Sequence, residues 1–329
     1  MSSVFHCIPG IELPVSEVVS SMAKMWESEP AKGHKPPSEF RASQMNLIVH
    51  LGYNTTTEEA KQLFRTANAF AHGYPSRIII LCPTPAEDAD TLLMGKLYSE
   101  CYIGQSMRDM RCCEILTLGY DENAPQYLEN QVSVWLESDL PAYYWCHRLP
   151  SERLNTVYKD FLRFCKCKIY DSSVEGRQFR SQLKEPEIYR NLSYARLLPL
   201  RQSIGQVLSG FEPSCLVEGL ESVTLSCSNA HYGEGGALSH WIYSCLEECA
   251  KIAGMKISFD LVDVSGGGTR DFDLKFHFSD NKQLQFLANI ASGTASLHGE
   301  MGRGVFSYSL KSGLLSPEKA LAEAIFFNN

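Results

Sequence analysis

The chain has 329 residues, of which 44% are hydrophobic and 21% are charged, a balance typical of a folded globular protein. Its net charge of −8 argues against a general nucleic-acid or anionic-membrane binder, because phosphate groups attract positively charged surfaces. We find no secretory signal and no run of about 18 apolar residues, so we expect a cytoplasmic protein that does not span a membrane. Most of its 12 cysteines are then expected to be reduced thiols that pack as small hydrophobic side chains.

The first 38 residues are predicted to form one amphipathic helix and a linker. Apolar residues recur at helical spacing over residues 14–28. The following stretch, EPAKGHKPPSE, is rich in proline, glycine and charge, which is typical of a connecting segment.

Strands alternate with helices between residues 39 and 185, which predicts an α/β domain with a layered, Rossmann-like sheet. Thr56 and Glu59 have the spacing of a capping box, and the apolar run SRIIILC is typical of a strand covered on both faces. The expected strands are 44–51, 76–82, 99–105, 112–120, 140–146 and 166–172, and the expected helices are 56–72, about 124–137 and 151–164.

Residues 186–215 are predicted to form a helical connection that Pro199 interrupts. Proline lacks an amide hydrogen, so we expect a short helical turn, a break at 198–199, and a longer helix. Two interpretations of the flanking arginines are open. The break lets Arg196 and Arg201 converge as a fork for carboxylate or phosphate, or each forms a salt bridge with an acid of the neighbouring domain.

Residues 216–329 are predicted to form an α+β domain. A strand at 221–227 and a helix at 235–254 precede four strands, at 256–264, 271–278, 284–290 and 304–310. Such a run of strands indicates an antiparallel meander, with the GGGT sequence as a hairpin turn between the first two and a helix at 317–327 as its end.

Few residues of the sequence match a known catalytic or binding pattern. Gly233, Gly235 and Gly236 predict a loop before a helix, where an anion could bind, but Leu238 breaks both the dinucleotide and the P-loop templates. Asp171 ends a strand at the edge where open α/β sheets bind ligands, but without a partner a turn-forming role is favoured over a catalytic one.

Cys245 and Cys249 share an apolar helix face, so a core role is favoured over metal binding. We therefore expect no catalytic residues and no metal site.

Six segments, taken in their order along the chain, resemble the glucose-6-phosphate dehydrogenase assembly protein OpcA family. They are FRASQMNLIVH, YPSRIIILCP, RCCEILTLGY, SDLPAYYWCHRLP, KIYDSS and NLSYARLLPLR. The resemblance implies a non-catalytic protein without a cofactor of its own. Such a protein binds glucose-6-phosphate dehydrogenase and promotes its assembly or activation in the oxidative pentose phosphate pathway. The candidate binding or interface residues are Arg41, Asn46, Ser76, Arg77, Asp171, Arg196 and Arg201, about half of which we expect to be internal supports.

Two other functions remain open at this point. One is an enzyme or sensor that binds a small phosphorylated metabolite, a sugar phosphate or a nucleotide, with Asp171, the arginines and residues 233–236 lining the pocket. The other is thiol-based redox control, suggested by the number of cysteines.

Overall fold

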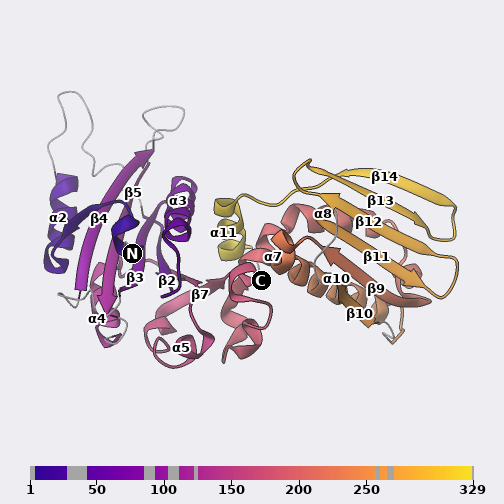
Figure 1. The fold of residues 1–329 in the computed structure, drawn as a ribbon, viewed down its shortest axis with the longest axis horizontal. Helices are drawn as coiled ribbons and strands as arrows, with labels where there is room; N and C mark the ends of the chain where they lie inside the picture. The colour runs from indigo at the N-terminus through magenta and orange to yellow at the C-terminus, as the bar shows by residue number, and fades with distance from the viewer. Residues whose placement is uncertain are drawn as a thin grey trace. The chain divides into compact units, whose positions relative to one another are not determined.

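The structure is a computed structural model that describes residues 4–27, 43–84, 93–102, 111–121, 125–256, 260–264 and 270–327. The chain divides into two compact units, shown in Figure 1. The first unit comprises Met1–Arg190 with Ala324–Asn329, and the second comprises Asn191–Glu323.

The first unit contains an eight-stranded sheet in the order β1-β4-β5-β3-β2-β6-β7-β8. The strands are β1 (Ile11–Leu13), β2 (Met45–Leu51), β3 (Ser76–Thr84), β4 (Leu93–Tyr102), β5 (Arg111–Asp121), β6 (Ala142–His147), β7 (Cys165–Tyr170) and β8 (Tyr189–Asn191). From β5 to β7 all neighbours are parallel, whereas β4 pairs antiparallel with β5, and β1 with β4. The predicted Rossmann-like α/β layer is therefore confirmed.

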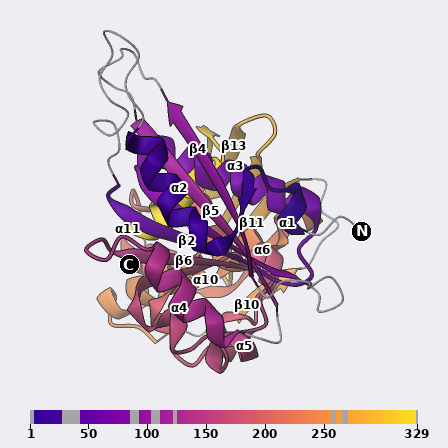
Figure 2. The same cartoon turned by 90° about the vertical axis from the view of Figure 1, so that its left-hand side faces the viewer.

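Helices lie on both faces of this sheet, as Figures 1 and 2 show. On one face, α2 (Val15–Glu27) and α4 (Gln126–Trp135) contribute Met22 and Trp135 to the same core cluster. On the other, α1 (Val4–Cys7) contacts α3 (Thr57–Gly73). Because helices cover both faces, the continuous apolar strands β2 and β3 are buried along almost their whole length.

The capping box at the start of α3 is confirmed, since the side chains of Thr56 and Glu59 each accept a hydrogen bond from the other residue's backbone amide. The prediction of one helix over residues 151–164 is wrong in the middle of this range. It is divided into α5 (Ser151–Asn155) and a 3-10 turn, η4 (Phe161–Phe164). Asn155 explains the division, because its side chain bonds the backbone of Gln182 and Lys184 at the point where the helix ends.

Two cysteines of the antiparallel edge are joined. Cys101 on β4 and Cys112 on β5 stand opposite each other in register and form a disulfide. The other 10 cysteines are free thiols, in agreement with the expectation that most of them are reduced. The predicted strand at 99–105 is the end of β4, and its last three residues lie outside the described part of the chain.

The second unit contains a six-stranded sheet in the order β10-β9-β11-β12-β13-β14. Its strands are β9 (Leu220–Cys227), β10 (Asp260–Val264), β11 (Phe272–Phe278), β12 (Gln283–Asn289), β13 (Thr294–Glu300) and β14 (Val305–Lys311). The last four pair antiparallel in sequence order, which confirms an antiparallel meander, although its strand β13 was not predicted. The apolar side chains that alternate along β11 are buried on one face, and helices cover this face in Figure 1.

The hairpin predicted around GGGT is wrong. Strand β10 pairs with β9 in parallel, and β11 pairs with the other edge of β9, so β10 and β11 are not neighbours. A parallel pair needs a crossover, which the long helix α10 (Tyr232–Ile252) provides between β9 and β10. Residues 266–269 themselves lie outside the described residues.

The helices of the second unit are α7 (Leu192–Arg196), α8 (Leu198–Leu208), α9 (Pro213–Val217) and α10, while α11 (Pro317–Phe326) ends in the first unit. The break that Pro199 predicts is confirmed to within two residues, because α7 and α8 meet at Leu197 and Pro199 lies in the first turn of α8. Within the described residues, we find no helix with both the length and the apolar composition that a bilayer span needs.

Candidate functional site

The parallel strands of the first unit reverse their order at β2, which has β3 on one side and β6 on the other. In open α/β sheets, ligands bind beyond the carboxyl ends of the strands at such a switch point. The candidate site is therefore the carboxyl edge, which we define as the ends of β2, β6 and β7 and the residues that directly follow them.

The turn after β2 is closed by the protein's own backbone. The amide of Gly52 donates a hydrogen bond to the carbonyl oxygen of His147, 2.6 Å away. A Cβ atom added at Gly52 would lie 1.8 Å from the carbonyl oxygen of Arg148. Glycine is therefore needed here because two chain segments touch, whereas in a dinucleotide fold the glycines of this turn make room for a phosphate.

The N-terminus of α3, which in such folds faces the pyrophosphate, is occupied by an internal ion pair. The Glu59 carboxylate accepts the backbone amide of Thr56 at 2.9 Å. Arg148 donates to the same carboxylate from Nε at 3.0 Å to each oxygen and from Nη2 at 2.5 Å. Hydrogen bonds from Arg148 lower the pKa of Glu59 to about 2, so this switch-point pair, Arg148 with Glu59, is ionised at neutral pH.

A second carboxyl group, that of Glu175, contacts the backbone at Arg148. The Arg148 backbone, which has a positive φ of 56°, donates its amide hydrogen to Glu175 Oε1 at 2.5 Å. Burial raises the pKa of Glu175 to about 7. Burial also lowers the pKa of His147, whose Nε2 lies 3.9 Å from Glu59 Oε2. The carboxyl edge thus holds one group that titrates near neutrality, which is common at functional sites and also occurs in structural clusters.

Asp171 also lies at this edge, directly after β7. Its side chain accepts the Ser173 amide at 3.0 Å and the Ser173 hydroxyl at 2.6 Å, and it caps α6 (Ser172–Glu175). This cap agrees with the turn-forming role that the sequence favours for Asp171.

Below the edge lies a buried network that the sequence did not reveal. His50 Nδ1 is 2.7 Å from the Tyr144 hydroxyl, and His50 Nε2 is 2.7 Å from the Tyr120 hydroxyl. Tyr120 in turn contacts the Tyr158 hydroxyl at 2.9 Å. Burial lowers the pKa of His50 to about 3, so the ring is neutral. No spacing rule could find this group, because its members come from four distant segments.

Three predicted residues lie at the opposite end of the strands, which we call the amino edge (Asn46, Ser76, Arg77 and their partners). All three are buried. The amide of Asn46 donates to the Glu137 carbonyl at 3.0 Å, and the hydroxyl of Ser76 donates to the Tyr74 carbonyl at 2.5 Å. They therefore support the fold from within. Arg41, the fourth predicted residue of this group, lies outside the described residues.

Arg77 is the centre of the amino edge. Its guanidinium contacts Glu114 at 3.0 Å and Glu137 at 2.5 Å, and it donates to the Trp135 carbonyl at 2.9 Å. Trp26 donates from its indole nitrogen to the same Glu114 carboxylate. Because Arg77 is only 4% exposed and Glu114 only 2%, this is a buried ionic cluster that ties α2 and α4 to the sheet.

Arg196 and Arg201 have different partners. Arg196 forms an ion pair with Glu234 of α10. The Arg201 guanidinium lies 3.8 Å from the centre of the Tyr194 ring and donates to its hydroxyl at 2.8 Å. Arg196 therefore forms a local salt bridge, the second of the two interpretations, whereas Arg201 makes a cation–π contact.

The glycines expected to form an anion-binding loop are helical, so that prediction is wrong. Gly233, Gly235 and Gly236 lie within the first turns of α10. The side chain of Glu234 is buried between them and already places a carboxylate near the positive end of the helix. Small neighbours permit this close packing, which is why the sequence looked like a flexible loop. Among the residues that the structure describes, no cluster of metal-ligating side chains is found either.

The fold defines a class of protein: a Rossmann-order α/β unit followed by a unit with a largely antiparallel sheet, here with its switch point closed. Within this class, residues 67–185 match the family model described as the glucose-6-phosphate dehydrogenase subunit N-terminal domain. Residues 67–185 thus match the OpcA glucose-6-phosphate dehydrogenase assembly domain, in agreement with the resemblance of the sequence segments.

A curated relative agrees with this assignment. The chain is 24% identical over 188 residues to a putative oxidative pentose phosphate cycle protein, OpcA, of a Synechocystis strain. The alignment covers 55% of this chain and 39% of the relative, so the chain spans about two fifths of that protein.

Among solved structures, glucose-6-phosphate 1-dehydrogenase of Mycobacterium avium superposes with a TM-score of 0.50 over 85% of this chain and 86% of the enzyme. At 8% identity, this similarity concerns the fold alone. A 3-ketoreductase of Actinomadura kijaniata, KijD10, gives a TM-score of 0.43 at 11% identity, covering 86% of this chain and 89% of that one.

Proposed function

We propose that the chain is a non-catalytic partner of glucose-6-phosphate dehydrogenase, which it binds in the cytoplasm and biases toward its active oligomer. The matched assembly domain and the OpcA relative support a link to this enzyme. A partner of this kind acts by binding the active state more tightly than the inactive one. Activity, partner and location of the whole protein are all part of the proposal.

The observation that carries the non-catalytic role is the closed switch point. A dinucleotide at α3 would have to displace the Arg148–Glu59 pair and the backbone that touches Gly52. The ion pair joins the first turn of α3 to the residue that follows β6, and the contact at Gly52 is between backbone atoms, so a side-chain rotation alone does not open the site.

The exposed face of α4 is the part of the matched domain that we propose for docking. Tyr127 and Val134 are 46% and 65% exposed and lie seven residues apart, hence on one side of the helix. Exposed apolar side chains on one face contribute to protein association, whereas the buried Asn46, Ser76 and Arg77 have no atoms to offer a partner.

The test is a titration of the chain into glucose-6-phosphate dehydrogenase from the same source, with light scattering for the mass of the complex and NADPH formation for activity. We expect a heavier complex and a change in activity that saturates at a fixed ratio of the two proteins. The Val134→Lys variant should weaken both effects.

Val305→Lys on β14 is the matched control, since it replaces another exposed valine, 84% exposed, outside the matched domain. Unchanged mass and unchanged activity with the native chain would refute the proposal. Equal losses in both variants would refute only the docking face.

The alternative, an enzyme or sensor for a sugar phosphate or nucleotide, has a separate test. A ligand that binds only the native state raises the melting temperature. We expect no shift with NADP, glucose 6-phosphate or 6-phosphogluconate, because the anion positions at α3 and α10 are taken by Glu59 and Glu234. A saturable rise with any of the three would favour the alternative.

A further inference from the structure

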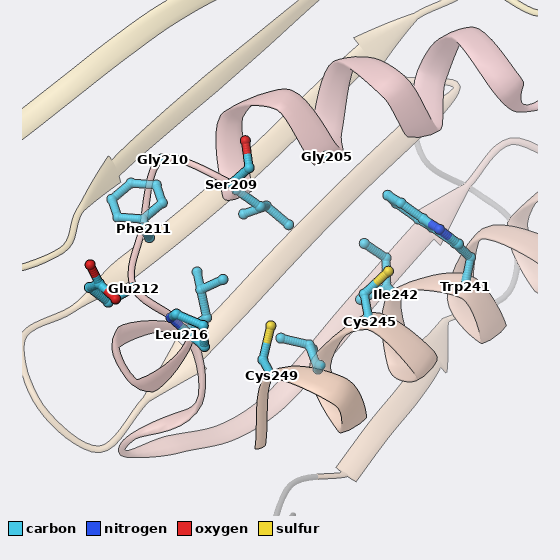
Figure 3. A pocket seen from close by; sticks show the side chains of 13 residues that line it. Gly205, Ser209, Gly210, Phe211, Glu212, Leu216, Trp241, Ile242, Cys245 and Cys249 are labelled. Carbon is cyan, nitrogen blue, oxygen red and sulfur yellow. The ribbon is translucent and has the colours of Figure 1, made fainter. Parts of the chain in front are cut away.

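The second unit has a pocket of about 430 Å³ between α8, α9 and α10 (Figure 3). Its walls are mostly apolar, with leucine, isoleucine, proline and glycine around two aromatic rings, Phe211 and Trp241. A volume in this range is typical of sites for small organic molecules. The pocket is remote from the carboxyl edge in sequence and lies wholly within the second unit, so it is independent of the proposed function.

Two thiols form part of the wall. Cys245 and Cys249 are one helical turn apart and project with Trp241 from one side of α10 toward the pocket (Figure 3). The sequence favoured a core role, but both are only partly buried because the pocket keeps them from being covered. Burial raises the pKa of each thiol above its ordinary value, so both are neutral and behave as polarisable apolar groups.

The pocket depends on a residue without a side chain. Gly205 of α8 faces the indole of Trp241, and a Cβ atom there would lie 3.9 Å from the ring, in ordinary contact. A longer side chain at this position would extend into the space between α8 and α10. Glycine also lowers helix stability, so its presence here costs stability and leaves the wall open.

Charge limits the kind of molecule that fits. Among the 13 lining residues, Glu212 is the only acidic one, and none is basic. Arg201 is close enough to influence Cys245, but its guanidinium is stacked on Tyr194 and it does not line the pocket. An anion would therefore meet a carboxylate and no counter-charge, which excludes phosphorylated metabolites from this pocket.

From these observations we propose that the pocket between α8, α9 and α10 is a binding site for a compact, neutral, ring-containing apolar molecule. The ring stacks on Trp241 and covers Cys245 and Cys249, where its burial and the contacts of sulfur with an aromatic face supply the affinity.

The probe for this site is N-phenyl-1-naphthylamine, a neutral aromatic compound whose fluorescence rises in apolar surroundings. We expect saturable binding to the full chain, with energy transfer from Trp241 that the Trp241→Phe variant loses. The other three tryptophans, Trp26, Trp135 and Trp145, are buried in the first unit.

Gly205→Leu should weaken probe binding roughly tenfold or more, because the new side chain occupies the pocket. Leucine has the higher helix propensity, so this variant is expected to fold. Gln206→Leu is the matched control: it places the same side chain one residue further along α8, where the side chain is exposed, and it should leave binding unchanged.

A second measurement follows the thiols directly. Iodoacetamide labelling, read by peptide mass spectrometry, should slow at Cys245 and Cys249 when the probe is saturating, and should not slow at the partly buried Cys215, which does not line the pocket. Absence of saturable binding overturns the proposal. Binding that Gly205→Leu leaves intact, without protection of the two thiols, overturns it as well.

Discussion

The two ends of the parallel sheet use the same chemistry in different surroundings. At the amino edge, the Arg77 and Glu114 side chains are 5% and 2% exposed, whereas at the carboxyl edge those of Arg148 and Glu59 are 38% and 28% exposed. A buried ion pair is costly to break because one charge is left buried without its partner. Breaking an exposed pair costs less, because water solvates the remaining charge. The buried ion pair of the amino edge therefore stabilises the unit. The exposed ion pair of the carboxyl edge contributes less to stability and mainly fills the position of a ligand.

The largest effect is expected at the amino edge. Arg77→Ala should destabilise the protein by about 3–5 kcal/mol, because it leaves the Glu114 carboxylate buried without the guanidinium that balances its charge. Urea unfolding followed by tryptophan fluorescence measures this, since three of the four tryptophans lie in the first unit. Arg65→Ala, on the exposed side of α3, is the control and should change stability little. Equal losses of stability in the two variants would contradict the expected difference between buried and exposed arginines.

The next largest loss of stability is expected at the carboxyl edge, and its cause is packing. Gly52→Ala should destabilise the protein by about 1–3 kcal/mol or more, because the new methyl group meets the Arg148 carbonyl and must push the two segments apart. Gly73→Ala, where a Cβ would meet nothing within 4 Å, is the matched control. Thermal unfolding of both variants gives the comparison, and a Gly52 variant as stable as the control would show that the turn is not tightly closed.

Glu175 should make the carboxyl edge sensitive to pH. Its folded-state pKa of about 7 exceeds its ordinary value of 4.5, so the folded state holds a proton that the unfolded chain releases. This contribution to stability is complete below about pH 4.5, falls as the pH rises to about 7, and is absent above that. Glu175→Gln should therefore stabilise the protein by about 1–2 kcal/mol at pH 8 and hardly at all at pH 4.5.

His50 acts in the opposite direction over an overlapping range. Its folded-state pKa of about 3 lies below its ordinary value of 6.5, so its contribution is present above pH 6.5 and is lost as the pH falls toward 3. In the native chain the two slopes partly cancel between about pH 4.5 and 6.5. In Glu175→Gln, stability should rise with pH over this window, as urea midpoints at several pH values would show. A variant whose pH profile parallels that of the native chain would contradict the assignment.

The smallest effect is expected from the switch-point pair itself. Arg148→Gln should cost only about 0.2–1 kcal/mol, and the difference should shrink in high salt, because this pair is partly exposed. Calorimetric melting at low and high salt measures both quantities. A loss as large as that of Arg77→Ala would mean that the two edges do not differ in kind.

Local patterns in the sequence predicted what local physics determines. The capping box at Thr56, the break near Pro199 and the alternation along β11 each depend on residues within a few positions of one another. The layered α/β sheet also followed from the alternation of strands with helices, because parallel neighbours require crossovers.

The errors have a common cause, which is that distant partners decide the outcome. Asn155 ends α5 by bonding residues around position 183, and β9 takes the place beside β11 that a GGGT hairpin would have given to β10. The glycine tract is helical and holds Glu234, whose partner Arg196 lies far from it in the sequence. The candidate site was missed for the same reason, since Glu59 and Arg148 are far apart in the chain.

The pairing pattern of the two sheets also bears on how the chain acquires its structure. In the meander, neighbours along the chain pair directly, as His277 does with Gln283, whereas in the parallel sheet Asn46 must find Ala142. Pairing of distant strands first requires a long loop to close, and the conformational entropy lost in this step slows folding. We therefore expect strands β11–β14 to assemble early and the pairing of β2 with β6 to form late. A segment that follows the parallel sheet in the sequence would then become ordered before that sheet is complete.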